Sequence, residues 1–167
     1  MRVLAVAVLF LFCSQGRAEF TWAEIEVEGL TCSMCARSVE LKVRELSFVE
    51  DVKMDLVATT MRIGFKKGSN VDVRSLAEAV DESGFSVGYV NAAFVFDGLE
   101  VSDGHCVLYQ DTAYSFVRTG DRTLDGETLL KFIGEPFLPE EELAGWENDL
   151  VDGCEHSGKT LWFVTVL

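Results

Sequence analysis

The sequence is poor in positive charge, in proline and in histidine. Against 28 acidic residues it carries only 14 lysines and arginines, and its formal net charge is −14. Nucleic acids and anionic membranes bind proteins through clustered positive charge that displaces counterions. The shortage of such charge therefore argues against a nucleic-acid partner and against an anionic membrane surface.

Motifs that carry catalysis are missing as well. The chain has no glycine-rich phosphate loop and no Gly-x-Ser-x-Gly nucleophile elbow. Its 167 residues are 49% hydrophobic and 25% charged, which is enough for one or two domains with a buried core. We predict a binding protein and not an enzyme.

The N-terminus has the three zones of a secretory signal peptide over residues 1–18. Arg2 supplies the positive charge, and ten apolar residues follow without interruption at positions 3–12. Small residues at Gly16 and Ala18 suit a signal peptidase that cuts after Ala18. A helix of ten residues rises only about 15 Å, half the thickness of the hydrocarbon layer, so the pattern predicts processing and not a membrane span.

We therefore expect an exported protein, periplasmic or secreted, with no membrane insertion after the signal peptide is removed. Cys13 raises a lipoprotein interpretation, but the bulky Phe12 stands where such sites carry a small residue. A buried N-terminal helix is the other interpretation of the apolar run. Processing would remove two basic residues and one cysteine, which leaves a net charge of −16 and four cysteines.

Apolar periodicity predicts a strand, helix, strand, strand, helix, strand order over residues 19–96. Residues 22–28 alternate as in a half-buried strand, and spacings of three and four from Ala36 to Leu46 indicate an amphipathic helix. Asp72 is a candidate N-cap and Gly84 a stop for the second helix. The other strands are expected near residues 52–56, 61–65 and 85–96. This order is typical of a ferredoxin-like βαββαβ domain, with two helices on one face of a four-stranded antiparallel sheet.

Residues 97–167 predict a second, smaller and mostly-β domain, so the fold class is α+β. Four β-leaning runs are separated by Asp-Gly dipeptides, which are typical of turns. The runs are residues 106–109, 114–117, 129–133 and 161–166, and the dipeptides stand at 97–98, 103–104, 125–126 and 152–153. One short helix is expected from Pro139 to as far as Leu150. We predict a small antiparallel sheet or a partly closed barrel, strongly acidic in charge.

Cys32 and Cys35 stand where the first predicted strand gives way to the first predicted helix. The helix dipole and the free N–H groups at a helix start favour thiolates, the form of cysteine that binds metal. Two soft sulfurs select a soft ion, and Cu(I), which accepts two ligands, suits them better than Mg²⁺ or Ca²⁺. A structural zinc site would need four protein ligands, and no second Cys-x-x-Cys occurs in this half of the chain.

The segment Gly29–Ala36 (Gly-Leu-Thr-Cys-Ser-Met-Cys-Ala), with Val39 and the Gly84-Phe85 pair, resembles the heavy-metal-associated domain family. The similarity covers about residues 21–95. This family includes copper chaperones, the N-terminal modules of metal-transporting ATPases and periplasmic mercury-binding proteins. The resemblance implies reversible binding and handover of Cu(I) by the two cysteines, with Zn(II), Cd(II) or Hg(II) as alternative ions.

The same resemblance implies that Leu30, Thr31 and Phe85 support the metal site. Leu30 stands where the family commonly has methionine, an apolar side chain that anchors the loop from beneath. Thr31, in place of aspartate before the first cysteine, resembles the copper members. The implied partner is a metal transporter or a metalloenzyme, met by direct protein contact at the cysteine-bearing edge.

Three other interpretations of this half stay open. One is a thiol–disulfide redox protein that uses the same Cys-x-x-Cys, although thioredoxin-type sites have a cis-proline opposite and the only prolines are Pro136 and Pro139. Another is a structural disulfide between Cys32 and Cys35, since an exported chain meets oxidants. The third is a non-catalytic interaction module.

Cys106 and Cys154 belong to the second half and invite three hypotheses, of which the simplest is two free, unrelated thiols. A disulfide between them would close a loop of 49 residues, which chain entropy predicts to stabilise the fold by about 4 kcal/mol. Alternatively, both histidines, His105 and His156, lie beside these cysteines, and the four residues together could supply a second metal site. Adjacent strand residues point to opposite faces, which disfavours a site that uses both His105 and Cys106.

Overall fold

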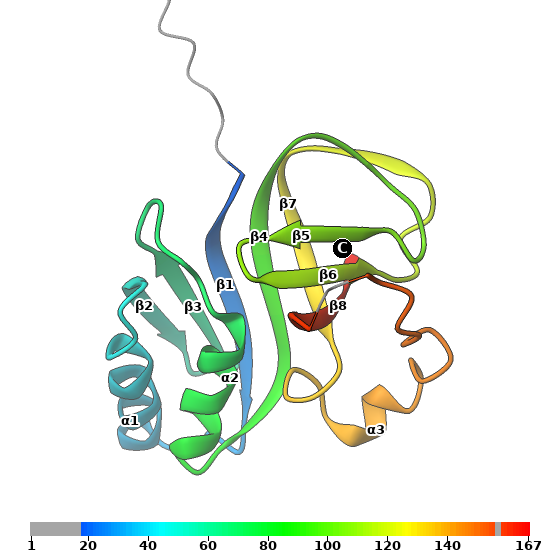
Figure 1. Cartoon of the computed structure of the whole chain (residues 1–167). Coiled ribbons are helices and arrows are strands. Elements are labelled where there is room, and N and C mark those ends of the chain that lie inside the picture. Colours follow the sequence, from blue (N-terminus) through cyan, green and yellow to red (C-terminus); the bar gives the residue numbers. More distant parts are fainter. Residues whose placement is uncertain (1–17, 156–157) are drawn as a thin grey trace, which may run out of the picture.

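A computed structural model of the chain describes residues 18–155 and 158–167 (Figure 1). The predicted signal peptide, apart from Ala18, lies outside the described residues, as do Cys13 and His156. The elements in chain order are β1 (Glu19–Glu28), α1 (Ser33–Arg44), β2 (Val49–Asp55), β3 (Thr60–Phe65), α2 (Val73–Glu82), β4 (Ser86–Val101), β5 (Cys106–Tyr109), β6 (Thr112–Phe116), β7 (Arg122–Ile133), α3 (Glu140–Leu143) and β8 (Thr160–Val166).

The first half has the predicted ferredoxin-like order. Strands β2, β3, β1 and β4 lie side by side, all antiparallel, and α1 and α2 cover one face of them (Figure 1). The alternation of β1 is confirmed, because Ala23, Ile25 and Val27 are all fully buried. The predicted cap is confirmed as well, since the Asp72 carboxylate accepts a hydrogen bond from the Arg74 N–H at 3.1 Å.

The second half continues the same sheet. The eight strands follow the order β2-β3-β1-β4-β7-β8-β6-β5, so β7 extends the ferredoxin-like sheet at the open side of β4. Strand β4 has 16 residues and runs through positions 96 and 97, where the sequence predicts a domain boundary. The two predicted halves therefore share one strand and one sheet.

Two of the four expected Asp-Gly turns lie inside strands instead. Asp97-Gly98 belongs to β4 and Asp125-Gly126 to β7. Between the pairs Phe96–Gly126 and Leu99–Leu124, β4 has two residues where β7 has one, which is a β-bulge. Gly98 has φ +65° and Gly126 has φ +73°, a region that favours glycine. Both glycines are therefore needed for the bulge between the paired strands, and not for a hairpin turn.

The expectation of an antiparallel second sheet is also corrected, because β6 and β8 pair in parallel. Helix α3 is shorter than expected and ends at Leu143. Beyond it, the Arg118 guanidinium donates a hydrogen bond to the Gly145 carbonyl oxygen at 2.5 Å, and the Asp149 N–H donates to the Trp146 carbonyl oxygen. The helix ends before these contacts, because the N–H groups of Gly145 and Trp146 bond to the carbonyls three residues back, those of Glu142 and Leu143, and do not continue the four-residue spacing.

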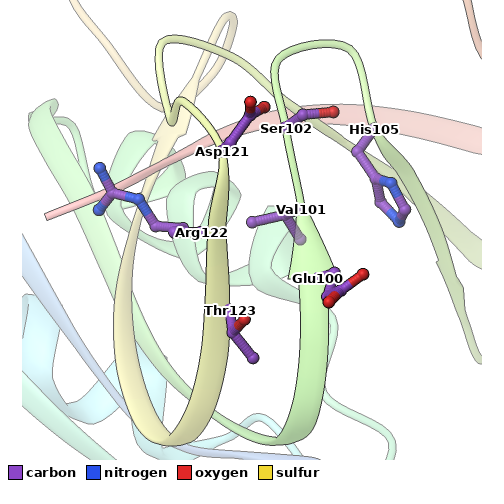
Figure 2. Close-up of a pocket in the computed structure, with 7 residues that line it drawn as sticks. All are labelled: Glu100, Val101, Ser102, His105, Asp121, Arg122 and Thr123. Carbon is purple, nitrogen blue, oxygen red and sulfur yellow. The ribbon is translucent and has the colours of Figure 1, made fainter.

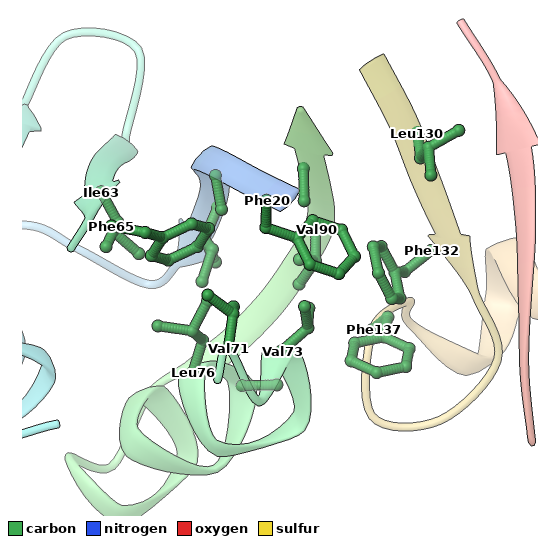
Figure 3. Close-up of a cluster of buried hydrophobic side chains, with 14 of the residues drawn as sticks. Phe20, Ile63, Phe65, Val71, Val73, Leu76, Val90, Leu130, Phe132 and Phe137 are labelled. Carbon is green, nitrogen blue, oxygen red and sulfur yellow. The ribbon is translucent and has the colours of Figure 1, made fainter. Parts of the chain in front are cut away.

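Buried side chains cover both faces of the sheet. The main cluster lies on the face that carries α1 and α2, and Figure 3 shows it reaching from Leu76 past Phe20 to Phe132 and Phe137. A smaller outer cluster lies on the opposite face. It consists of Val117, Ile133 and Leu138, with Tyr89, Leu143, Trp146, Leu150 and Phe163 packed against them.

Candidate metal-binding site

The loop between β1 and α1 is set by one glycine. Gly29 follows the last residue of β1 with φ +79°, a conformation that a residue with a Cβ rarely adopts. A Cβ at this position would meet nothing nearer than the Phe85 Cδ1 at 3.9 Å, so space is not the constraint. The backbone turn itself therefore requires glycine here and brings the next residues to the start of α1.

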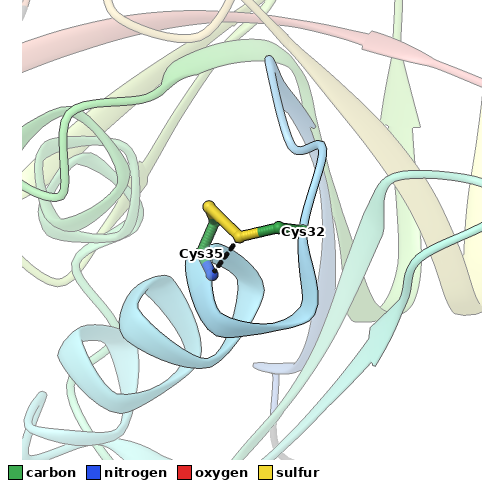
Figure 4. The surroundings of a disulfide bond; sticks show 2 residues. All are labelled: Cys32 and Cys35. Carbon is green, nitrogen blue, oxygen red and sulfur yellow. Dashed lines mark hydrogen bonds between the residues drawn. A yellow bond between two sulfur atoms is a disulfide. The ribbon is translucent and has the colours of Figure 1, made fainter.

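Cys32 is the N-cap of α1. Its backbone is extended, with φ −143° and ψ 151°, and its Sγ accepts a hydrogen bond from the Cys35 N–H at 3.1 Å (Figure 4). An N-cap side chain satisfies one of the free N–H groups of the first turn. The sulfur of Cys32 thus occupies the place where helix geometry favours negative charge.

The two predicted sulfurs meet in a disulfide. The Cα atoms of Cys32 and Cys35 are 5.3 Å apart, and their Sγ atoms are bonded (Figure 4). Cys32 is exposed to solvent and Cys35 is half-buried. The first turn of α1 contains no acidic residue, and its last turn contains Lys42 and Arg44, so α1 brings no competing carboxylate to the sulfurs.

The residues expected to support the loop fall into two groups. Leu30 and Phe85 are partly buried and pack against the main cluster, whereas Thr31 is exposed. Met34, between the two cysteines, is 83% exposed, and sequence reasoning did not single it out. The signal for its exposure was its position, two residues before Ala36, on the polar side of the helical pattern.

The donor set at this site consists of two sulfurs. Among the residues that the structure describes, no group of three His, Cys, Asp or Glu side chains could hold a metal ion. In the dithiol form, two thiolates with no further side-chain ligand suit a soft ion of low coordination number and do not complete a four-ligand zinc site. The residues therefore fit Cu(I) as a bound and released substrate.

Cys106 and Cys154 form the second disulfide. It joins β5 to the segment before β8, with the two Cα atoms 5.8 Å apart. Sulfurs bonded to each other present no thiolates, so this oxidised form lacks two ligands of the second-metal-site hypothesis. His156 lies outside the described residues, and His105 lines a different feature of the surface.

That feature is a hollow of about 580 Å³ at the far end of β4. It is lined by Glu100, Val101, Ser102, His105, Asp121, Arg122 and Thr123 (Figure 2). Arg122 points away from Glu100 and His105 in this view. The lining brings together no metal-binding group among the described residues.

No α-helix within the described part of the chain is long and apolar enough to cross a membrane.

The chain matches a known protein family over part of its length. The model of the heavy-metal-associated domain family matches residues 24–86. The copper chaperone CopZ of Bacillus subtilis is 33% identical over 63 residues, which are 38% of this chain and 90% of the chaperone. A probable copper-exporting P-type ATPase of Archaeoglobus fulgidus is 32% identical over 63 residues, and the chain spans only 8% of that protein.

Solved structures also match part of the chain. The N-terminal domain of a potential copper-translocating P-type ATPase from Bacillus subtilis, in its Cu(I)-loaded state, is 26% identical and has a TM-score of 0.38. That match covers 41% of this chain and 85% of the solved domain. The family match, at residues 24–86, includes Cys32 and Cys35.

Proposed function

The chain belongs to the heavy-metal-associated domain family through its first half, and from this premise we propose that it binds Cu(I) between Cys32 and Cys35 and hands the ion to a protein partner. One observation carries the proposal. The Cys-x-x-Cys of a copper-chaperone-like domain lies at the start of α1, with one sulfur exposed and one half-buried. We propose a binding role and no catalysis.

The chemistry of handover follows from the openness of the site. Cu(I) accepts thiolate ligands readily, and a site with only two of them leaves room for a sulfur donor from a partner. Because Cys32 is exposed, a partner ligand can reach the ion before both original ligands have left. The half-buried Cys35 would then be the last to release it.

The partner and the compartment are also proposals. The relatives include probable copper-transporting ATPases, which supports a membrane transporter as the recipient or donor of the ion. A metalloenzyme is the alternative partner. Export to the periplasm or the exterior rests on the sequence of residues 1–18 alone.

The decisive experiment is a metal titration of the whole protein. We would reduce it under anaerobic conditions and titrate it with Cu(I) against a competing chelator, then with Zn(II), Cd(II) and Hg(II). The double variant Cys32→Ser/Cys35→Ser should lose more than about 100-fold in Cu(I) affinity, because loss of even an outer-shell partner costs up to about that factor. The matched control, Cys106→Ser/Cys154→Ser, should keep wild-type affinity. Unchanged Cu(I) binding in the first variant would refute the proposal.

A redox function is the second candidate, because the structure shows the same two sulfurs as a disulfide. A thiol–disulfide oxidoreductase would turn over, reducing many substrate disulfides per molecule in the presence of a reductant. We expect no such turnover with insulin as the substrate. Sustained turnover that disappears in Cys32→Ser would favour the redox function over metal handover.

A further inference from the structure

The two disulfides of this protein differ in their surroundings. Cys32 is exposed at a helix start, whereas Cys154 is only 9% exposed. Exchange with an external thiol requires access to a sulfur and a stabilised leaving sulfur. We propose that Cys32 is a thiol-exchange site, at which an external dithiol opens the Cys32–Cys35 disulfide while the Cys106–Cys154 disulfide stays closed.

The exposed Cys32 Sγ is the more accessible point of attack. A thiolate of the reductant attacks the exposed Cys32 Sγ, forms a mixed disulfide and breaks the bond to Cys35. The electron pair leaves on the Cys35 Sγ, which takes up a proton. Attack at Cys35 is less accessible, because that residue is half-buried in the first turn of α1.

The second step completes the balance of electrons and protons. The other thiol of the reductant attacks its own sulfur within the mixed disulfide, and the Cys32 Sγ leaves with the electron pair. The Cys35 N–H, which already donates to this sulfur at 3.1 Å, stabilises the departing charge. Two electrons and two protons have then passed to the protein, and the reductant has become a cyclic disulfide.

The Cys106–Cys154 disulfide stays closed because one of its sulfurs is buried. Cys106 is exposed on β5, but attack there would leave the charge on the buried Cys154. Burial disfavours a charged sulfur. The segment before Cys154 is also held in place, since Arg118 pairs with Asp149 at 2.5 Å and lies 4.2 Å from the Trp146 ring centre. The Cys154 Sγ, kept near Cys106 in this way, would form the Cys106–Cys154 disulfide again.

The exchange would control Cu(I) binding, and this consequence rests on the proposed function. The disulfide form of Cys32 and Cys35 offers no thiolate pair, so the protein in that state cannot take up Cu(I). Reduction by a dithiol protein or a small dithiol restores the two ligands. The same compartment can then keep one disulfide as a permanent crosslink while the other is switched.

The test separates the two disulfides by mass. The oxidised whole protein is treated with graded dithiothreitol under anaerobic conditions, quenched with acid and alkylated, and each cysteine peptide is quantified. We expect Cys32 and Cys35 to become labelled at least about tenfold faster than Cys106 and Cys154. Equal rates, or earlier labelling of Cys106 and Cys154, would overturn the proposal.

A pair of variants tests which sulfur is attacked. Cys35→Ser leaves a single thiol at Cys32, and Cys32→Ser leaves one at Cys35. With oxidised glutathione as the probe, we expect the mixed disulfide to form faster at Cys32 than at Cys35, and equal or reversed rates would contradict the assignment. Copper binding is measured separately on the reduced protein, so a protein that exchanges as expected but binds no Cu(I) refutes the function and leaves the exchange site standing.

Discussion

Phe132 of β7 is enclosed between the two halves of the sheet, and its replacement by alanine would show whether the halves unfold together. The side chain is fully buried, and its ring centre lies 6.3 Å from that of Phe20 and 5.0 Å from that of Phe137. Phe20 belongs to β1 and Phe137 to the segment after β7. Phe132→Ala would thus open a cavity that both halves line.

The expected loss is large compared with the stability of a protein of this size. Phenylalanine-to-alanine replacements in cores cost about 3–5 kcal/mol, and whole proteins are stable by about 5–15 kcal/mol. The corresponding fall in melting temperature is about 6–20 °C. Leu108→Ala is the control, because Leu108 is 60% exposed and its loss should change stability by less than about 0.5 kcal/mol.

The assay must report on each half separately. Urea unfolding followed by circular dichroism gives the free energy of unfolding of the whole protein. Hydrogen exchange measured by mass spectrometry gives the protection of α1 and of β7 individually. We expect a single transition in which α1 and β7 lose protection together and shift to lower urea in Phe132→Ala. If α1 kept its wild-type midpoint while β7 shifted, the two halves would be independent units and the continuous-core argument would be wrong.

Three further predictions concern stability. Cys106→Ser/Cys154→Ser should lower the free energy of unfolding by about 4 kcal/mol, the loop-entropy value for 49 residues, measured by urea unfolding under non-reducing conditions. Asp72→Ala should cost about 1 kcal/mol through loss of the α2 cap, and Asp72→Asn, which can still accept the bond, should restore most of it. Backbone N–H bonds from Gly120 and Thr119 hold the pKa of Asp103 below its usual 3.8, so its contribution is present above that pH and is lost as the pH falls through the lowered value. Asp103→Asn should therefore reduce the acid dependence of the melting temperature below about pH 4.

Local patterns were enough to predict the first half of the fold. The period-two pattern of Ala23, Ile25 and Val27 places all three in the core, and Asp72 and Gly84 mark the ends of α2 as expected. The Cys-x-x-Cys at a strand-to-helix junction was likewise readable, because its geometry depends on neighbours in sequence. Signals of this kind need no knowledge of distant contacts.

The same local patterns could not predict which distant strands pair with each other. Asp97-Gly98 reads as a turn, and only the partner strand β7 turns it into a bulge. The parallel pairing of β6 with β8 joins strands that are separated by more than 40 residues, and no local pattern in either strand specifies its partner. The proximity of Cys106 to Cys154 has the same origin, so the sequence left a disulfide and a metal site as competing hypotheses.

Strand β4 shows what the second half does for the first. Ala92 and Ala93 are successive residues and both are fully buried, although successive side chains of a strand point to opposite faces. One face of β4 therefore belongs to the main cluster, and the opposite face lies on the side of the sheet where Ile133 of the neighbouring strand β7 joins the outer cluster.

A four-stranded ferredoxin-like domain alone would leave β4 at an edge with that second face open. The start of the same strand pairs with the end of β1, Ser86 opposite Glu28, directly before the cysteine loop. The loop that carries Cys32 and Cys35 thus lies beside the start of β4, whereas β7 pairs with the same strand from Asn91 onward and places that later part in the interior of the sheet. A fragment of residues 19–96 would lack the strand that pairs with Asn91–Val101, so the whole chain is the form in which the proposed site should be measured.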